Sequence, residues 1–231
     1  YCHLEQYSGF FSAITDYSSG SYCLPGAIIG TLLAALVVRA LGFTGNVARL
    51  LDSVAPGGAL AVVFIRLSSL FNVSCRSKIS ISSPLLQHLP IGSGIVNSSG
   101  VLEYRFATFF VQAMLMLGVT VLLLYFFYAR RRLPMKEGCP RDGNVAWMFL
   151  VFHSAVELLM DSTRYDSSFM HFNAFVSIVQ IFSAVCILIA LIHYSRLSVR
   201  ANGRQGYHFA MWIGYFFTLA GTGAAEYLVQ R

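Results

Sequence analysis

Residues 105–128 read RFATFFVQAMLMLGVTVLLLYFFY, and this stretch decides the class of fold. After Arg105 it contains no charged residue. As an α-helix it is long enough to cross a hydrocarbon core of about 30 Å. Other apolar runs of roughly 17–25 residues recur along the chain, so we predict helices that span a membrane.

The composition agrees with this interpretation. Of 231 residues, 56% are hydrophobic and only 11% are charged, whereas a soluble domain carries about 25% charged residues. The alternating apolar segments of about ten residues that are typical of outer-membrane barrels are absent. The sequence therefore predicts an all-α, polytopic transmembrane helical bundle with about six spans. The predicted spans are approximately Leu24–Ala40, Val54–Phe71, Arg105–Tyr128, Asn144–Met160, Phe172–Tyr194 and Tyr207–Val229.

The basic residues give this bundle an orientation. Ten of the sixteen Lys and Arg residues lie in the connections after the first, third and fifth predicted spans, and five lie on the other side. By the positive-inside rule the first set of connections is cytoplasmic. Residues 73–104 and 161–171 are then outside the cell. This placement explains the net charge of +6 without a nucleic-acid partner.

Three regions are expected along the chain. The sequence does not begin with Met, and residues 1–20 are polar without the features of a signal peptide. We expect an extracytoplasmic segment over residues 1–21, with earlier spans missing before it. A membrane domain follows over 22–196, and residues 197–231 form a cytoplasmic loop plus an extra C-terminal transmembrane helix. The five cysteines show no C-x-x-C pair, and we predict no metal or cofactor.

Arg66 is the residue most out of place in lipid. It lies within the predicted span Val54–Phe71, where an Arg costs about 2.5–3.5 kcal/mol to insert. This span runs outward, so Arg66 lies in the outer-leaflet half, where it can hold a phosphodiester by two parallel hydrogen bonds. Ser68, Ser69 and Asn72 follow and make a polar patch at the same depth. The alternative is an Arg that snorkels to the interface and binds no ligand.

A second polar group occurs in the fourth predicted span. Glu157, Asp161 and Arg164 are spaced by four and three residues, so they share one face of a continuing helix. Pairing between Asp161 and Arg164 at the outer helix end is the simpler alternative. Because this group and Arg66 both fall in the outer leaflet, we predict that they form one lipid-headgroup pocket.

Other polar residues in the spans have simpler interpretations. His153 lies one turn before the acidic residues, and we interpret it as a satisfied or interfacial His instead of a general base. Gln112 and Gln180 can link helices by hydrogen bonds without a chemical role. Gly26, after Pro25, indicates a close helix approach or an unwound helix start.

With these residues placed, the chain resembles a divergent branch of the bacterial prolipoprotein diacylglyceryl transferases from Tyr22 to about Arg196. The family signature Gly-Arg-x-Gly-Asn-Phe-x-Asn is similar to residues 65–72, IRLSSLFN, and matches at Arg66 and Asn72. Residues 24–30, LPGAIIG, resemble the family's His/Tyr-Gly-Gly-Leu-Ile-Gly helix start. Residues 51–56, LDSVAP, resemble its Leu-x-Asp-x-x-Ala-Pro segment.

The resemblance continues downstream. Residues 161–166, DSTRYD, are similar to the family's Glu-x-x-Arg-x-x-Asp stretch. Residues 110–113, FVQA, lie where the family has Leu-Tyr-Glu-Ala, so Gln112 replaces a Glu. Leu24 replaces the motif His/Tyr and Ser74 replaces a second Glu, so the resemblance does not identify the catalytic base.

The resemblance implies a transfer of diacylglycerol from phosphatidylglycerol to the lipobox cysteine of a preprolipoprotein. The reaction takes place at the outer face of the bacterial plasma membrane and releases glycerol 1-phosphate. The expected partners are phosphatidylglycerol, lipobox peptides and membrane lipids. We predict that Arg66 and Arg164 are catalytic. The predicted substrate-binding residues are Asn72, Ser69, Asp161, Glu157, Gln112 and Gly26.

Two alternatives stay open at this point. The first is a family member that binds phospholipid without catalysis, having kept Arg66 and Arg164 but lost the base. The second is a transporter of small solutes or ions, with Arg66, Asp161 and Glu157 along its pathway. A transporter is expected to show broken helices in corresponding halves of the chain, and only Pro25 and Gly26 have this character.

Overall fold

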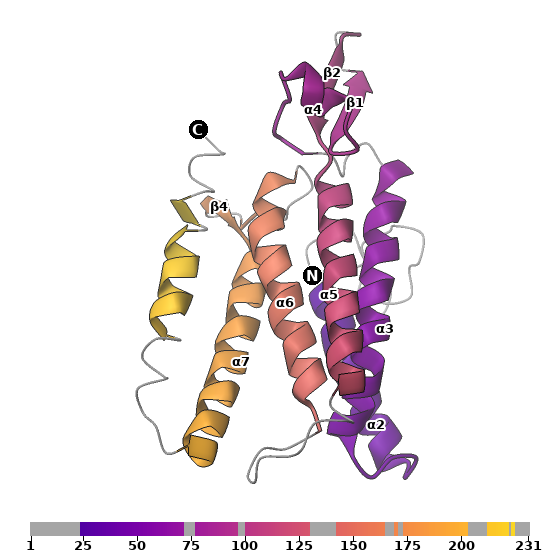
Figure 1. Ribbon diagram of the computed structural model, residues 1–231, viewed down its shortest axis with the longest axis vertical. Helices are drawn as coiled ribbons and strands as arrows, with labels where there is room; N and C mark the ends of the chain where they lie inside the picture. The colour runs from indigo at the N-terminus through magenta and orange to yellow at the C-terminus, as the bar shows by residue number, and fades with distance from the viewer. Residues whose placement is uncertain are drawn as a thin grey trace, which may run out of the picture. The chain divides into compact units, whose positions relative to one another are not determined.

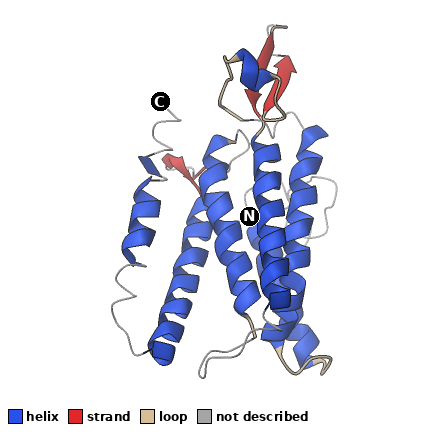
Figure 2. Ribbon diagram, in the orientation of Figure 1, coloured by secondary structure: helices blue, strands red, loops and turns tan. Residues whose placement is uncertain are grey.

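The computed structural model describes residues 24–71, 77–96, 100–129, 142–164, 169–170, 173–202, 212–221 and 223–224. Most of them are helical (Figures 1 and 2). The chain divides into two compact units, Tyr1–Gly45 and Asn46–Arg231, and each is described by itself. The first unit contains helix α2 (Leu24–Ala40), most of whose Leu and Val side chains are exposed.

The second unit is built around four long helices. They are α3 (Val47–Ser68), α5 (Thr108–Ala129), α6 (Asn144–Met160) and α7 (Ile178–Asn202). Helix α6 contacts the other three, and α3 also packs along α5 (Figure 1). A shorter helix, Trp212–Gly221, contacts α7, where the Tyr215 hydroxyl donates to the Ala184 carbonyl at 3.1 Å. Helix α6 is therefore the centre of the bundle.

The helices have the length and surface of membrane spans. Three of them, Val47–Ser68, Thr108–Ala129 and Ile178–Leu197, are long and apolar enough to cross a bilayer. Their outward sides carry large apolar side chains, such as Phe64 and Val121, which are 63% and 61% exposed. In water such a surface would drive aggregation, but in a bilayer it faces lipid tails. The chain is a polytopic membrane protein.

The predicted helical class is confirmed, with differences in detail. Helices α2 and α6 begin and end at the predicted residues. Helix α3 begins at Val47 instead of Val54, because Asn46 caps it by accepting from the backbone N–H groups of Ala48 and Arg49. Helix α5 begins at Thr108 and α7 at Ile178, both later than predicted, because the residues before them form strands.

Two small antiparallel sheets correct the expectation of an all-α chain. Strand β1 (Gly92–Val96) pairs with β2 (Leu102–Phe106), and β3 (Phe169–Met170) pairs with β4 (Asn173–Ser177). Both hairpins lie in polar connections between helices. They were missed because the apolar runs that predict spans carry no information about such connections.

These connections meet at one end of the bundle. The residues before β1 include the short helix α4 (Pro84–Gln87). Upstream of it, Lys78 N donates to Thr163 O at 3.0 Å and Ser77 Oγ donates to the same oxygen at 2.8 Å. Thr163 belongs to the turn η4 (Asp161–Thr163) that follows α6. The connections after α3 and after α6 therefore share one end, as the predicted topology requires.

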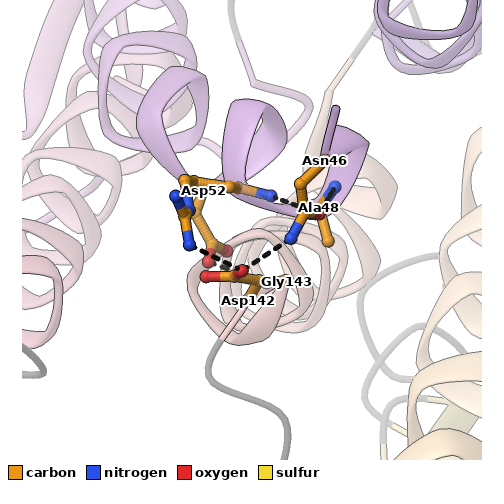
Figure 3. Close-up of polar contacts among 6 residues, drawn as sticks. Asn46, Ala48, Asp52, Asp142 and Gly143 are labelled. Atoms are coloured by element: carbon orange, nitrogen blue, oxygen red, sulfur yellow. Dashed lines mark hydrogen bonds and ion pairs between the residues drawn. The ribbon is translucent and has the colours of Figure 1, made fainter. Parts of the chain in front are cut away.

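At the opposite end, Asp52 of α3 caps the N-terminus of α6 (Figure 3). Its Oδ2 accepts from Gly143 N at 2.7 Å and its Oδ1 accepts from Ala146 N at 2.9 Å. Gly143, the N-cap residue, has a left-handed φ of 97° and no side chain of its own to cap the helix. A carboxylate at a helix N-terminus also interacts favourably with the helix dipole. Asp52 thus joins α3 to α6 by satisfying two N–H groups.

A second contact reinforces this joint. Asn46 Nδ2 donates to Asp142 Oδ2 at 2.6 Å, and Arg49 Nη2 lies 3.4 Å from the same oxygen (Figure 3). Both N-termini therefore lie at the same end, and α3 and α6 run parallel. Fourteen residues separate Asp52 from Arg66 on α3, and fourteen separate Gly143 from Glu157 on α6. At a rise of about 1.5 Å per residue, the two helices bring Arg66 and Glu157 to the same level.

We expect Asp52→Ala to destabilise the bundle by about 2–3 kcal/mol, because two N–H groups at the start of α6 lose a charged acceptor. Asp52→Asn should lose less stability than Asp52→Ala, because the Asn side chain keeps one acceptor oxygen. The measurement is the free energy of unfolding in detergent micelles. The control is Ser53→Ala, whose hydroxyl bonds Leu50 O of its own helix at 2.7 Å. An Asp52→Ala variant as stable as this control would contradict the capping role.

Candidate functional site

Arg66 and Glu157 form a buried ion pair between α3 and α6. Arg66 Nη2 lies 2.7 Å from Glu157 Oε1, and the two side chains are 11% and 3% exposed. Arg66 is in the last turn of α3 and Glu157 is one turn before the end of α6. The Asp52 cap fixes the register in which these positions meet. The pair offsets the cost of each charge, which would be large for either residue alone.

Gln112 brings helix α5 into this contact. The side chain is fully buried, and its Nε2 donates to Glu157 Oε1 at 2.8 Å. An ionised carboxylate only accepts hydrogen bonds, so the amide must turn its NH₂ group toward Glu157. This requirement fixes the orientation of the amide and directs Gln112 Oε1 away from the carboxylate. Three helices thus converge on one carboxylate oxygen.

His153 belongs to the same cluster. It lies one turn before Glu157 on α6, is 2% exposed, and stacks on Phe149 with ring centroids 5.5 Å apart. Glu157 and Arg66 are both charged neighbours that interact electrostatically with its ring. Within the described part of the chain its Nδ1 makes no hydrogen bond. The prediction of a satisfied His153 therefore fails for Nδ1 among the described residues, and its position relative to the membrane interface stays a prediction.

Several buried atoms of this cluster have no hydrogen-bond partner among the described residues. They are Arg66 Nε, Gln112 Oε1, His153 Nδ1 and Glu157 Oε2. A buried polar atom without a partner costs about 1–3 kcal/mol. Four such atoms on three neighbouring helices, around one ion pair, are the pattern expected of a site that binds a polar group.

A second group of polar residues follows the end of α6. Asp161 is 3% exposed. Burial raises the pKa of Asp161 above its ordinary value, while a hydrogen bond with Ser177 and the charges of Arg164 and Arg66 act in the opposite direction. The charge of Arg164 also acts on Glu157. Both arginines therefore act on the same two carboxylates, although about a hundred residues separate them in the sequence.

The remaining predicted residues are less closely tied to this site. The Ser69 hydroxyl, just after the end of α3, turns back to Ile65 O in the last turn of that helix, at 3.5 Å. Gly26 lies in α2, in the other unit. Asn72 lies outside the described residues. The roles of these three residues stay predictions.

The sequence did indicate that His153 belongs to this cluster. His153 and Glu157 are four residues apart, so they lie on one face of α6. Ser154, 2% exposed, is a further buried polar neighbour on this helix. Gln180, predicted as a link between helices, accepts from Ser177 N at 2.9 Å at the start of α7. Among the described residues, no three His, Cys, Asp or Glu side chains are grouped as metal ligands would be.

A bundle of apolar helices around a buried cluster of Arg, Glu, Gln and His defines a class of protein: a membrane protein with a polar site buried among its helices. The family model for prolipoprotein diacylglyceryl transferase matches residues 2–196, and the chain belongs to this family. The comparisons with curated proteins and with solved structures found no match. The resemblance seen in the motifs is confirmed.

Membership of this family gives the reaction. The family transfers diacylglycerol from phosphatidylglycerol to the cysteine of prolipoproteins. As a member of this family, the chain is a transferase of this kind. Its substrates are thus a phospholipid and a prolipoprotein. This match favours the transferase over the transporter alternative.

We expect Glu157→Ala to destabilise the protein by about 3–5 kcal/mol, because it leaves Arg66 buried without a counter-charge. The double variant Arg66→Met with Glu157→Leu should recover most of this loss, since no charge stays buried. Unfolding free energies in detergent test both. The control is Glu103→Gln, whose bridge to Arg105 on β2 is partly exposed and should contribute only about 0–1 kcal/mol. Equal losses for Glu157→Ala and the control would contradict a buried pair.

Proposed function

We propose that Arg66 holds the phosphate of phosphatidylglycerol during the transfer. A guanidinium has five N–H donors, and the contact with Glu157 engages Nη2. Arg66 is also more exposed than Glu157, 11% against 3%, so it is the member of the pair that a ligand reaches first. The observation that carries the proposal is a buried guanidinium, held in place by a carboxylate, whose Nε has no partner among the described residues.

The reaction explains why an arginine is useful here. The cysteine thiol loses its proton, and its sulfur forms a bond to the glyceryl carbon that carries the phosphate. The bond between that carbon and the phosphate oxygen breaks, and glycerol 1-phosphate leaves with one more negative charge than the phosphodiester had. A positioned guanidinium stabilises this growing charge more in the transition state than in the bound lipid.

The other predicted residues take supporting roles in this proposal. Arg164 is a second catalytic cation, because its charge acts on the same carboxylates as Arg66. Glu157 and Gln112 orient Arg66 and contact the lipid headgroup, and Asp161 contributes from the turn after α6. The substrate-binding roles of Asn72, Ser69 and Gly26 are proposed on the resemblance alone. The base that takes the thiol proton is left unassigned.

We propose about six spans, with the site toward the outer leaflet of a bacterial plasma membrane. The shorter apolar helices Gly26–Ala40, Asn144–Met160 and Trp212–Gly221 are then spans as well. The ten-to-five distribution of basic residues supports this orientation. Residues 1–21 are then extracytoplasmic, 22–196 the transferase domain, and 197–231 a cytoplasmic loop with a final span. Lipobox peptides approach from the end that carries β1 and β2.

Thiol labelling tests this orientation. In a background with the native cysteines replaced by Ser, we expect Ser82→Cys to react with a membrane-impermeant maleimide in intact cells. Lys136→Cys should react only after permeabilisation, because the positive-inside rule places it in the cytoplasm. The reverse labelling pattern would overturn the topology and the outer-leaflet position of the site.

Substitution of Arg66 tests the catalytic proposal. We expect Arg66→Lys to lower transfer by roughly a hundred- to thousandfold, because a lysine cannot reproduce two parallel hydrogen bonds to the phosphate. Arg66→Ala should lose at least as much. The measurement is thioether-linked diacylglyceryl transfer to a lipobox peptide at matched expression. Arg49→Lys, at the other end of α3 with a side chain 76% exposed, is the control and should retain activity.

The outcomes separate the competing interpretations. A snorkelling arginine predicts an unaffected Arg66→Lys variant, since Lys reaches the interface equally well. That result would remove Arg66 from the mechanism. A wild-type protein without any transfer would support the phospholipid-binding alternative.

A further inference from the structure

Two of the buried atoms without partners are hydrogen-bond acceptors. Gln112 Oε1 and Glu157 Oε2 accept no hydrogen bond from any described residue. The Gln112 amide cannot be flipped to exchange its oxygen and nitrogen, because its NH₂ group must face the carboxylate. Glu157 likewise receives Arg66 and Gln112 on Oε1. The site therefore combines the N–H donors of Arg66 with two neighbouring acceptor atoms that receive no hydrogen bond from a described residue.

These groups belong to side chains that meet at one carboxylate oxygen. Arg66 Nη2 and Gln112 Nε2 contact the same oxygen, at 2.7 and 2.8 Å, so the two side chains are neighbours. The unused acceptors are the second oxygens of the same carboxylate and the same amide. A ligand that fits this arrangement has an anionic group for Arg66 and, a few bonds away, groups that donate hydrogen bonds.

Phosphatidylglycerol has this arrangement of groups. Two hydroxyl groups lie on the two carbons beyond the one bonded to its phosphodiester. We propose that Gln112 Oε1 and Glu157 Oε2 accept hydrogen bonds from these hydroxyls and so select the glycerol headgroup. The inference rests on the proposed function, because it requires Arg66 to hold the phosphate.

The same acceptors disfavour other headgroups. A choline headgroup has no N–H or O–H donor, so the two acceptors would stay buried and unpaired. A headgroup with hydroxyls supplies the donors that the two acceptors lack.

The test compares lipids that differ only in these hydroxyls. Transfer to a lipobox peptide is measured with phosphatidylglycerol and with phosphatidylpropanol of the same acyl chains, in neutral detergent micelles. For the wild type we expect kcat/KM to be about ten- to a hundredfold lower for each hydroxyl removed. Lipids with a single hydroxyl, phosphatidyl-1,2-propanediol and phosphatidyl-1,3-propanediol, should be intermediate. Equal rates for all four lipids would overturn the proposal, and this series requires no variant to fold.

A variant then assigns the selectivity to Gln112. We expect Gln112→Met to lower transfer from both lipids, because Gln112 also donates to Glu157, but to lower transfer from phosphatidylglycerol about tenfold more, so that the ratio falls about tenfold. The control is Thr120→Val on the same helix, whose buried hydroxyl bonds Met116 O at 2.8 Å and should leave the ratio unchanged. If Gln112 only orients Glu157, both lipids lose activity equally, and an unchanged ratio would overturn its role in selectivity.

The outcome also separates this inference from the proposed function. Transfer that depends on Arg66 but has the same rate with and without the headgroup hydroxyls would refute the headgroup inference. It would leave the phosphate role of Arg66 intact. Transfer that is indifferent to Arg66→Lys would refute the proposed function itself, whatever the lipid ratio.

Discussion

The buried ion pair between Arg66 and Glu157 determines how α3 and α6 pack against each other. Each charge lies in an apolar helix, where it would cost several kcal/mol alone, so α3 and α6 must present them to each other. Gln112 of α5 joins them on the same oxygen. The Asp52 cap at the other end of α3 and α6 fixes their register. Two polar contacts, about 21 Å apart along parallel helices, thus position the site.

The pair also suits the chemistry of the family. Glu157 neutralises Arg66 and so makes it possible to bury the guanidinium at lipid depth. Gln112 stands where the family motif has Glu, and here it donates to Glu157, whereas a second ionised carboxylate would repel it. The departure from the motif therefore agrees with the ion pair. The charge of Arg164, which follows the turn after α6, also acts on the Glu157 carboxylate.

The sequence predicted the helices better than the contacts between them. Long apolar runs identified every long helix, but the start of α3 was hidden because Arg49 and Asp52 interrupt its first turns. Their charges are explained only by partners on α6 and just before it. The sequence showed the cost of Arg66 and placed it in one pocket with Glu157, yet their direct pairing across 91 residues lay beyond spacing rules, which apply within one helix. His153 is different, because its four-residue spacing from Glu157 on α6 was visible in the sequence.

A structure of the wild-type protein in phosphatidylglycerol nanodiscs would show directly what Arg66 binds. We expect a lipid phosphate within hydrogen-bond distance of the Arg66 guanidinium, with its glycerol headgroup against Gln112 and Glu157. We also expect Glu157 to hold Arg66 in the complex. A lipid phosphate bound elsewhere in the bundle, with Arg66 in contact only with Glu157, would rule out this role of Arg66.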